Sequence, residues 1–345
     1  MRLIRRLPVV TVVGLLIAVS TTGGAADPAL TGFAAQINAL SEPGGYFDTD
    51  NLISNERSYL QVLPDLERAG VRGGAYVGVG PDQNFSYIAH VRPAIAFIVD
   101  IRRDNLLLHL LFKALFEQAH TRIEYLALLF GRPPPPGAEH WTTDPVERLV
   151  AYIDGTPAQR QLMVASRARV DAAIRRYGVP LTPADRATIG GFHERFAGAG
   201  LDLRFESTGR PPQSHYPTYR ELLLAVDSLG RQGHFLASEE YFQFVKSLEG
   251  RNLVLPVVGD LAGPTALIKI GTVLENRREP LSTFYTSNVE FYLARAGTED
   301  RFLENLAHLP RLPRAVIIRS VFGRFNGGST SVTENVGDVL AARAH

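Results

Sequence analysis

Two glycines and an aspartate stand at the spacing of a nucleotide-binding site. Residues 74–80 are mostly apolar and predict a buried strand with a turn at Gly78 and Gly80. A second apolar segment, 94–99, ends in Asp100, 20 residues after Gly80. Glycines in a strand-to-helix turn let the backbone approach a ligand closely, and an acid ending the next strand accepts hydrogen bonds from ribose hydroxyls. The pattern predicts a nucleotide or nucleoside site; the alternative is a tight turn that only packs the fold.

Asp82 narrows the kind of ligand. It stands where the helix after the glycine turn is expected to begin. A carboxylate there is stabilised by the helix dipole but repels a phosphate group. The sequence therefore disfavours NAD or NADP and permits a ligand without phosphate. For Asp100, the alternative to ribose binding is a helix cap or an ion pair with Arg102 or Arg103.

Two later strands also end in polar residues. Residues 252–258 lead to Asp260, and residues 281–287 lead to Asn288 and Glu290. Because parallel strands bring their carboxyl ends to one edge, we expect these side chains to share a cleft with the glycine turn. Asn288 would orient a substrate amine or hydroxyl, or instead cap the next helix. Glu290 is the acid/base candidate, since a carboxyl group shielded from water is suited to proton transfer.

The elements that position these residues alternate along the chain. Five apolar segments, interspersed with helical patterns, predict an α/β fold with a mostly parallel sheet covered on both faces. Between the second and third strands, 104–250 has helical periodicity and no convincing pair of strands. The expected organisation is a helical segment at 27–70, sheet halves at 71–103 and 251–325, a helical insertion or cap at 104–250, and a flexible tail at 326–345.

Residues 1–26 predict a secretory signal peptide. Arg2, Arg5 and Arg6 precede an apolar run too short to span a bilayer comfortably, and small residues lead to Asp27. We expect an exported protein, periplasmic or secreted, with no stable membrane span after cleavage. The alternative is an uncleaved N-terminal anchor.

Composition excludes several classes of function. A formal net charge of +1 gives no basic surface for nucleic acid. With no cysteine, the chain has no disulfide, thiolate metal site or cysteine nucleophile. Glu117, His120 and Glu124 have a metal-ligand spacing on one helical face, but no second matching helix exists, so we expect no metal. A Gly-x-Ser-x-Gly elbow is also absent.

The strand ends resemble those of class I S-adenosylmethionine-dependent methyltransferases. The resemblance implies a Rossmann-like sheet of that type, with the glycine turn facing the methionine part of the cofactor. It implies Asp100 at the ribose and Asp260 at the adenine amino group, and it adds Gln83, Asn84 and Ile101 as further cofactor-binding residues. Asn288 would lie beside the reacting methyl group.

The chain also departs from that family's pattern. Tyr76 and Asp82 occupy positions where the family has an acid and a third glycine. The fourth strand ends in Ser287-Asn288-Val289-Glu290 in place of Asn/Asp-Pro-Pro-aromatic, and little chain follows Ser320 for the usual antiparallel hairpin. These departures affect the cofactor contacts more than the fold.

A closer resemblance covers nearly the whole chain after residue 26. Five motifs in order are similar to a family of uncharacterised bacterial exported proteins and lipoproteins with a methyltransferase-like fold: Ser54-Asn55-Glu56 and residues 78–85, 97–103, 257–260 and 285–290. The first of them also offers a cap for the helix that follows it. The resemblance implies fold and export, and no reaction.

We therefore expect an exported methyltransferase-like protein that binds S-adenosylmethionine, a related nucleoside or another small molecule at the strand ends. S-adenosylmethionine is made in the cytoplasm, which favours the alternative of a non-enzymatic envelope protein that keeps the fold without the cofactor. A different metabolite-processing enzyme on the same scaffold is a third reading, because fold does not fix function.

Overall fold

The computed structural model describes residues 28–49, 51–207, 213, 215–322 and 329–343, so the predicted signal peptide lies outside the described residues. One sheet has the order β3-β2-β1-β4-β5-β6. The strands are β1 (Ala75–Gly78), β2 (Ile95–Asp100), β3 (Val254–Val258), β4 (Leu281–Ser287), β5 (Arg311–Phe322) and β6 (Ser329–Asn335). β1 to β5 are parallel, and β6 is antiparallel to β5. The predicted α/β fold with a mostly parallel sheet is confirmed.

The strands β1 to β4 lie inside the molecule, and β1 to β3 are mostly apolar in sequence. Every residue of β1 and β3 is buried, whereas β2 and β4 each end in a partly exposed residue, Asp100 and Ser287. Parallel strands with helices on both faces have such apolar runs. The sheet therefore becomes polar where these two central strands end.

The expectation of a flexible tail at 326–345 was wrong for the part that is described. Residues 329–335 form β6, which completes an antiparallel pair with β5, and α14 (Val336–Arg343) follows. The polar sequence of β6 gives no strand pattern. It is ordered by pairing with β5 and by Ser58, whose Oγ accepts a hydrogen bond from the Ser331 N–H at 3.1 Å.

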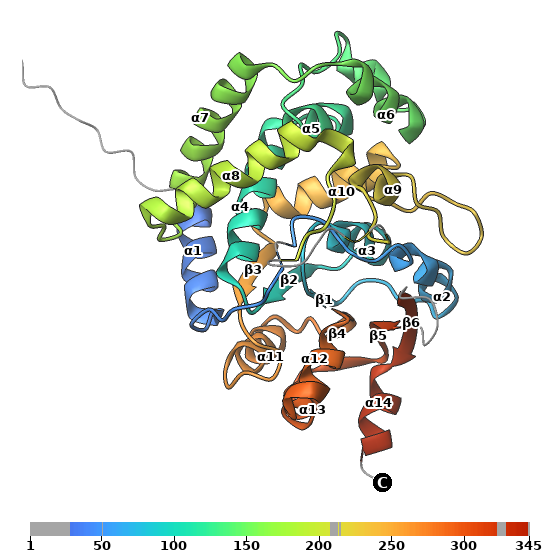
Figure 1. The fold of residues 1–345 in the computed structure, drawn as a ribbon. Helices are drawn as coiled ribbons and strands as arrows, with labels where there is room; N and C mark the ends of the chain where they lie inside the picture. Colours follow the sequence, from blue (N-terminus) through green and yellow to red (C-terminus); the bar gives the residue numbers. More distant parts are fainter. Residues whose placement is uncertain (1–27, 50, 208–212, 214, 323–328, 344–345) are drawn as a thin grey trace, which may run out of the picture.

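Helices cover both faces of the sheet (Figure 1). Residues 103–250, here called the cap, form α4 (Arg103–Gln118), α5 (Arg122–Leu129), η2 (Ala138–Trp141), α6 (Val146–Gly155), α7 (Arg160–Tyr177), α8 (Pro183–Ala199), η3 (Gly200–Asp202), α9 (Tyr219–Leu223) and α10 (Glu239–Gly250). α4 packs on β2 and β3, and α10 packs on α3 and α4. These two helices connect the cap to the sheet.

The other helices lie outside the cap. They are α1 (Pro28–Leu40), η1 (Tyr59–Val62), α2 (Leu63–Arg68), α3 (Gln83–Val91), α11 (Ala266–Arg277), α12 (Val289–Ala296) and α13 (Glu299–Ala307). Figure 1 shows α11 to α13 on the side of the sheet away from the cap. No helix in the described ranges has the length and apolar character needed to cross a bilayer.

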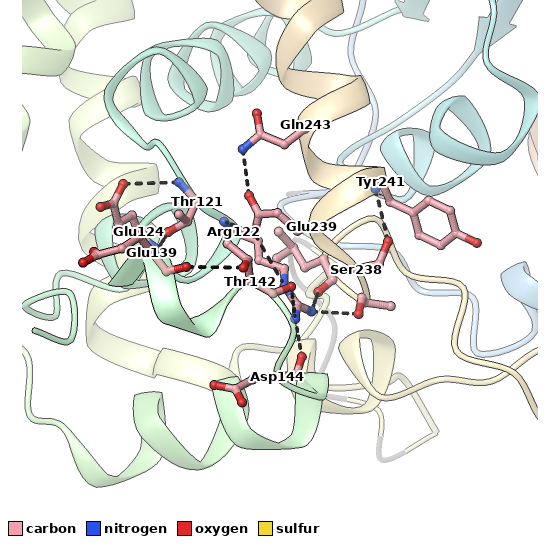
Figure 2. Close-up of polar contacts among 12 residues, drawn as sticks. Thr121, Arg122, Glu124, Glu139, Thr142, Asp144, Ser238, Glu239, Tyr241 and Gln243 are labelled. Carbon is pink, nitrogen blue, oxygen red and sulfur yellow. Dashed lines mark hydrogen bonds and ion pairs between the residues drawn. The ribbon is translucent and has the colours of Figure 1, made fainter. Parts of the chain in front are cut away.

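A buried arginine joins three segments of the cap. The Arg122 side chain, in the first turn of α5, is 1% exposed and donates to the carbonyl oxygens of Leu236 at 2.9 Å, Ala237 at 2.7 Å and Asp144. It also lies 3.7 Å from a Glu239 carboxylate oxygen. Figure 2 shows the guanidinium between the loop before α6 and the start of α10. Buried charges need such partners, so Arg122 serves the architecture of the cap.

A buried ion pair joins α4 to α10. The Lys113 ammonium donates to the Glu249 backbone carbonyl and lies 3.5 Å from its carboxylate. It also lies 4.8 Å from the ring centre of Phe33 on α1 and 5.3 Å from that of Tyr177 on α7. Burial raises the pKa of Glu249 to about 7, so its charge depends on this lysine. Four helices converge on one ammonium group.

We predict that Lys113→Met lowers the free energy of unfolding by about 3 kcal/mol at pH 7, because Glu249 is left buried and unpaired. The double variant Lys113→Met/Glu249→Gln should recover part of that loss, since no unpaired charge remains. Urea unfolding of both variants and the wild type measures the difference. A single variant as stable as the wild type would contradict the prediction.

Candidate functional site

A cavity of about 280 Å³ lies at the carboxyl ends of β1 to β4. Its wall comes from the N-terminal segment 47–55, the strand ends, α12 and the cap residues Phe205, Ser207 and Tyr216. The predicted site residues that line it are Gly80, Gln83, Asp100, Ile101, Asp260 and Asn288. Gly78, Asn84 and Glu290 are not part of this lining. The volume is at the lower end of the roughly 300–1,000 Å³ of small-molecule sites.

Asn84 shapes the glycine turn from within. It is fully buried, and its Nδ2 donates to the carbonyl oxygens of Val79 at 2.9 Å and Pro81 at 2.7 Å. Its Oδ1 accepts a hydrogen bond from the Tyr76 hydroxyl at 2.8 Å. A Cβ atom on Gly78 would lie 2.1 Å from that Oδ1. Gly78 and Asn84 therefore build the turn, and neither of them lines the cavity.

Gly80 provides the ligand-facing bend of the same turn. Its φ of +84° is a conformation that L side chains rarely adopt. Its carbonyl oxygen lies 2.9 Å from His109 Nε2 on α4. Burial lowers the pKa of His109 to about 4, so the ring is neutral at pH 7 and Nε2–H donates to Gly80. The cap thus fixes the turn that borders the cavity.

Asp82 is turned away from the ligand space. Its carboxylate accepts a hydrogen bond from the Tyr219 hydroxyl of α9 at 2.8 Å and does not line the cavity. Burial raises the pKa of Asp82 to about 7. The expectation that Asp82 repels phosphate at the start of α3 is corrected. Its carboxylate is buried against Tyr219 of the cap and does not face the cavity where a phosphate group would lie.

Asp100 borders the cavity as half of an ion pair. Its Oδ1 accepts from the Arg102 backbone N–H at 2.9 Å and from Arg102 Nε at 3.3 Å, while Oδ2 accepts from Nη2 at 3.2 Å. Arg102 Nη1 also donates to the Thr49 carbonyl at 2.7 Å. Each carboxylate oxygen can accept two hydrogen bonds. A ligand hydroxyl would therefore bind Oδ2 beside Arg102.

Glu42, which the sequence analysis did not identify, holds the loop that carries Asp260. Its carboxylate accepts from the N–H groups of Thr265 at 2.6 Å, Ala266 at 2.7 Å and Asp260 at 3.4 Å. Partial burial opposes ionisation, but the hydrogen bonds from Ala266 and Thr265 prevail and lower the pKa of Glu42. Asp260 Oδ1 in turn accepts from the Ala262 N–H at 2.9 Å. These hydrogen bonds hold the loop that carries Asp260.

Glu290, the predicted acid/base residue, does not line the cavity and pairs with Arg319. Its Oε1 accepts from Thr286 Oγ1 at 2.8 Å and Arg319 Nε at 3.0 Å. Since α12 begins at Val289, the first turn of the helix directs Glu290 toward β5, where Arg319 lies. Asn288 is the N-cap residue of α12 and lines the cavity, but its side chain makes no capping hydrogen bond.

The buried carboxyl group beside the cavity belongs to Glu56. It is 1% exposed and accepts from the Tyr285 hydroxyl at 3.0 Å and from Ser287 Oγ. In the described part of the chain no Lys, Arg or His side chain pairs with it. Burial raises the pKa of Glu56. Glu56 belongs to the Ser54-Asn55-Glu56 motif, from which the sequence predicts a helix cap and no buried carboxyl group.

Gln83 presents an unused acceptor at the cavity wall. Its Nε2 donates to the Tyr285 hydroxyl at 3.3 Å, while Oε1 is buried with no hydrogen-bond partner among the described residues. Buried polar atoms are nearly always hydrogen-bonded, so this oxygen is an exception at a residue that lines the cavity.

The described residues include no group of three or more His, Cys, Asp or Glu side chains that could hold a metal ion. The spacing of Glu117, His120 and Glu124 serves other contacts. Glu117 pairs with Arg176 and accepts from the Tyr177 hydroxyl at 2.8 Å, and Glu124 closes the N-terminal cap of α5.

Comparison with known proteins gives a family without a known activity. The model of a domain of unknown function, DUF7790, matches residues 51–132 and 213–337, more than half of the chain. The matched segments contain Glu56, the glycine turn and the ends of β1 to β4, and they omit residues 133–212 of the cap. No curated protein matches the chain. The chain belongs to the DUF7790 family.

Proposed function

We propose that the cavity binds S-adenosylmethionine or a related nucleoside and that the protein is an exported methyltransferase-like protein. The observation that carries this proposal is the convergence of Gly80, Asp100, Asp260 and Asn288 on one cavity from the ends of four strands. The sheet order and the antiparallel β5–β6 pair add support, because the methyltransferase type also ends in an antiparallel hairpin.

The polar atoms of the cavity fit such a ligand. Asp100, Asp260 and Gln83 Oε1 are acceptors, which match amino and hydroxyl donors. Among the described lining residues the cationic side chain is Arg102, and Asp100 already pairs with it. This set of groups favours a ligand rich in donors and poor in phosphate.

The proposed roles follow from position. Asp100 and Asp260 would hold the nucleoside, and Gln83 would accept from its amino-acid part. The bound cofactor supplies an electrophilic methyl group. The contribution of the chain is to hold an acceptor near Asn288 in line with that group, where positioning alone lowers the barrier by several kcal/mol, roughly 7–11 in the best cases.

A second candidate function is favoured by one observation. Asp100, the ribose ligand implied by the resemblance, already makes three hydrogen bonds with Arg102. A strand end satisfied in this way is also compatible with a non-enzymatic envelope protein that binds another small molecule in the same cavity.

We predict that purified protein binds S-adenosylmethionine and S-adenosylhomocysteine and that Asp100→Asn weakens both affinities by about 10-fold to 100-fold. The reason is the loss of a charge-assisted hydrogen bond, worth about 1.5–3 kcal/mol. Isothermal titration calorimetry measures the affinities. Asp104→Asn, an exposed aspartate outside the cavity lining, is the matched control and should bind like the wild type.

Failure of the wild type to bind either compound would reject the cofactor and leave the envelope-binding alternative. Equal affinity in Asp100→Asn and the wild type would reject the assignment of Asp100 to the ribose.

A second prediction concerns ligand charge. Adenosine should raise the melting temperature of the protein more than AMP or NAD does at equal concentration, because Asp100 and Asp260 repel a phosphate group and Arg102 is already paired. Thermal-shift measurements at low and high salt test this. A larger shift with NAD than with adenosine would show that the cavity accepts phosphate.

A further inference from the structure

The contact between Ser287 and Glu56 has the form of a proton relay. Ser287 lines the cavity, whereas Glu56 lies behind it and is almost inaccessible to solvent. Ser287 Oγ donates to Glu56, and its lone pairs remain able to accept a hydrogen bond from a molecule in the cavity. A group in the cavity can therefore pass a proton to Glu56 through Ser287.

The backbone of Ser287 is strained in a way that serves this contact. Its φ is +54°, in the left-handed region that non-glycine residues seldom occupy. The residue ends β4 immediately before α12, so the conformation places a hydroxyl at the strand-to-helix turn. Such strain persists where surrounding structure enforces it and clusters at functional sites.

Among Glu56 and the tyrosines near it, the Glu56 carboxyl group is the one that can exchange a proton. The Tyr285 hydroxyl of β4 donates to Glu56, whereas the hydroxyls of Tyr76 on β1 and Tyr87 on α3 donate to Asn84 Oδ1 and to the Tyr59 carbonyl. Burial raises the pKa of all three tyrosines well above the usual value, so their hydroxyls stay neutral. The other hydroxyl group that donates to the Glu56 carboxylate is that of Ser287.

The cavity beside Ser287 also indicates what donates the proton. α12 lines it with apolar and aromatic side chains, including Tyr292 and Leu293. The Tyr292 ring packs edge to face on Phe47 of the N-terminal segment, with centroids 4.7 Å apart. Asn288 adds an amide next to Ser287. An aromatic ring that carries a hydroxyl group matches this wall.

We propose that Ser287 and Glu56 remove the proton from a phenolic acceptor during methyl transfer, which rests on the proposed function. The acceptor oxygen attacks the methyl carbon of S-adenosylmethionine, and the carbon–sulfur bond breaks with its electron pair left on sulfur. The phenol proton passes to Ser287 Oγ while the serine proton passes to Glu56 Oε1. The products are the methyl ether, S-adenosylhomocysteine and a protonated Glu56, which returns its proton to solvent.

The test uses 4-nitrophenol, whose absorbance reports its ionisation, with and without S-adenosylhomocysteine. Bound to the wild type, the probe should absorb as phenolate at a lower pH than it does free in solution. Glu56→Gln removes the proton acceptor, so burial should hold the bound probe neutral to a higher pH. With S-adenosylmethionine present, Glu56→Gln should methylate the probe at least about 100-fold more slowly.

Ser287→Gly is the matched variant that keeps the fold. Glycine adopts the positive φ without strain, which offsets part of the cost of losing the hydrogen bond to Glu56, so this variant should still fold. It should still bind S-adenosylhomocysteine with wild-type affinity while losing the phenolate signal and the methylation. 4-Nitroaniline, of similar shape but without the hydroxyl, should not be methylated.

The outcomes separate the two proposals. If the wild type fails to bind S-adenosylhomocysteine but still ionises the probe through Ser287 and Glu56, the cofactor is rejected and the relay stands. The relay is overturned if the wild type does not ionise the probe, or if Ser287→Gly and Glu56→Gln ionise it as the wild type does. Loss of S-adenosylhomocysteine affinity in both variants would also overturn it, because a structural role would then explain the defect.

Discussion

The turn between β1 and α3 is buried, so its polar atoms need hydrogen-bond partners within the protein. Those partners come from α3 and from the cap helices α4 and α9. The Asn84 amide donates to the carbonyl groups of Val79 and Pro81, and His109 of the cap helix α4 reaches the carbonyl of Gly80. Asp82 at the end of the turn bonds Tyr219 of α9. Unsatisfied buried groups cost about 1–3 kcal/mol each. The turn therefore depends on the cap for two of its hydrogen bonds.

That dependence shapes the cavity. Arg122 and Lys113 hold the cap helices to one another. The cap is attached to the sheet through α4, which packs on β2 and β3, and through α10, which packs on α3 and α4. On the other side, the N-terminal segment brings Glu42 to the loop of Asp260 and Glu56 to the end of β4. The cavity at the strand ends is thus lined by segments that are far apart in sequence.

Two glutamates near the end of β4 show how environment selects a role. Glu290 is partly exposed and bonds Arg319, so its charge is compensated. Glu56 has hydroxyl partners and is removed from water, which raises the pKa of its carboxyl group. A buried carboxyl group with hydroxyl partners is the arrangement suited to accept a proton from a neighbouring hydroxyl group. In the sequence, the closeness of Glu290 to Asn288 favours it as the acid/base residue. In the folded chain, the carboxyl group that contacts the cavity residue Ser287 is that of Glu56.

The sequence by itself determined the parallel strands, because continuous apolar runs such as 95–99 and 254–258 can be buried only between layers. It also placed Gly80, Asp100, Asp260 and Asn288 at strand ends, since strand direction alone brings those residues together. Tertiary structure decided what patterns cannot encode: β6, which is polar and ordered by pairing, and the partners of Asn84, Asp82, Glu56 and Glu290. Those contacts join residues far apart along the chain or depend on where a helix begins, so no local pattern carries them.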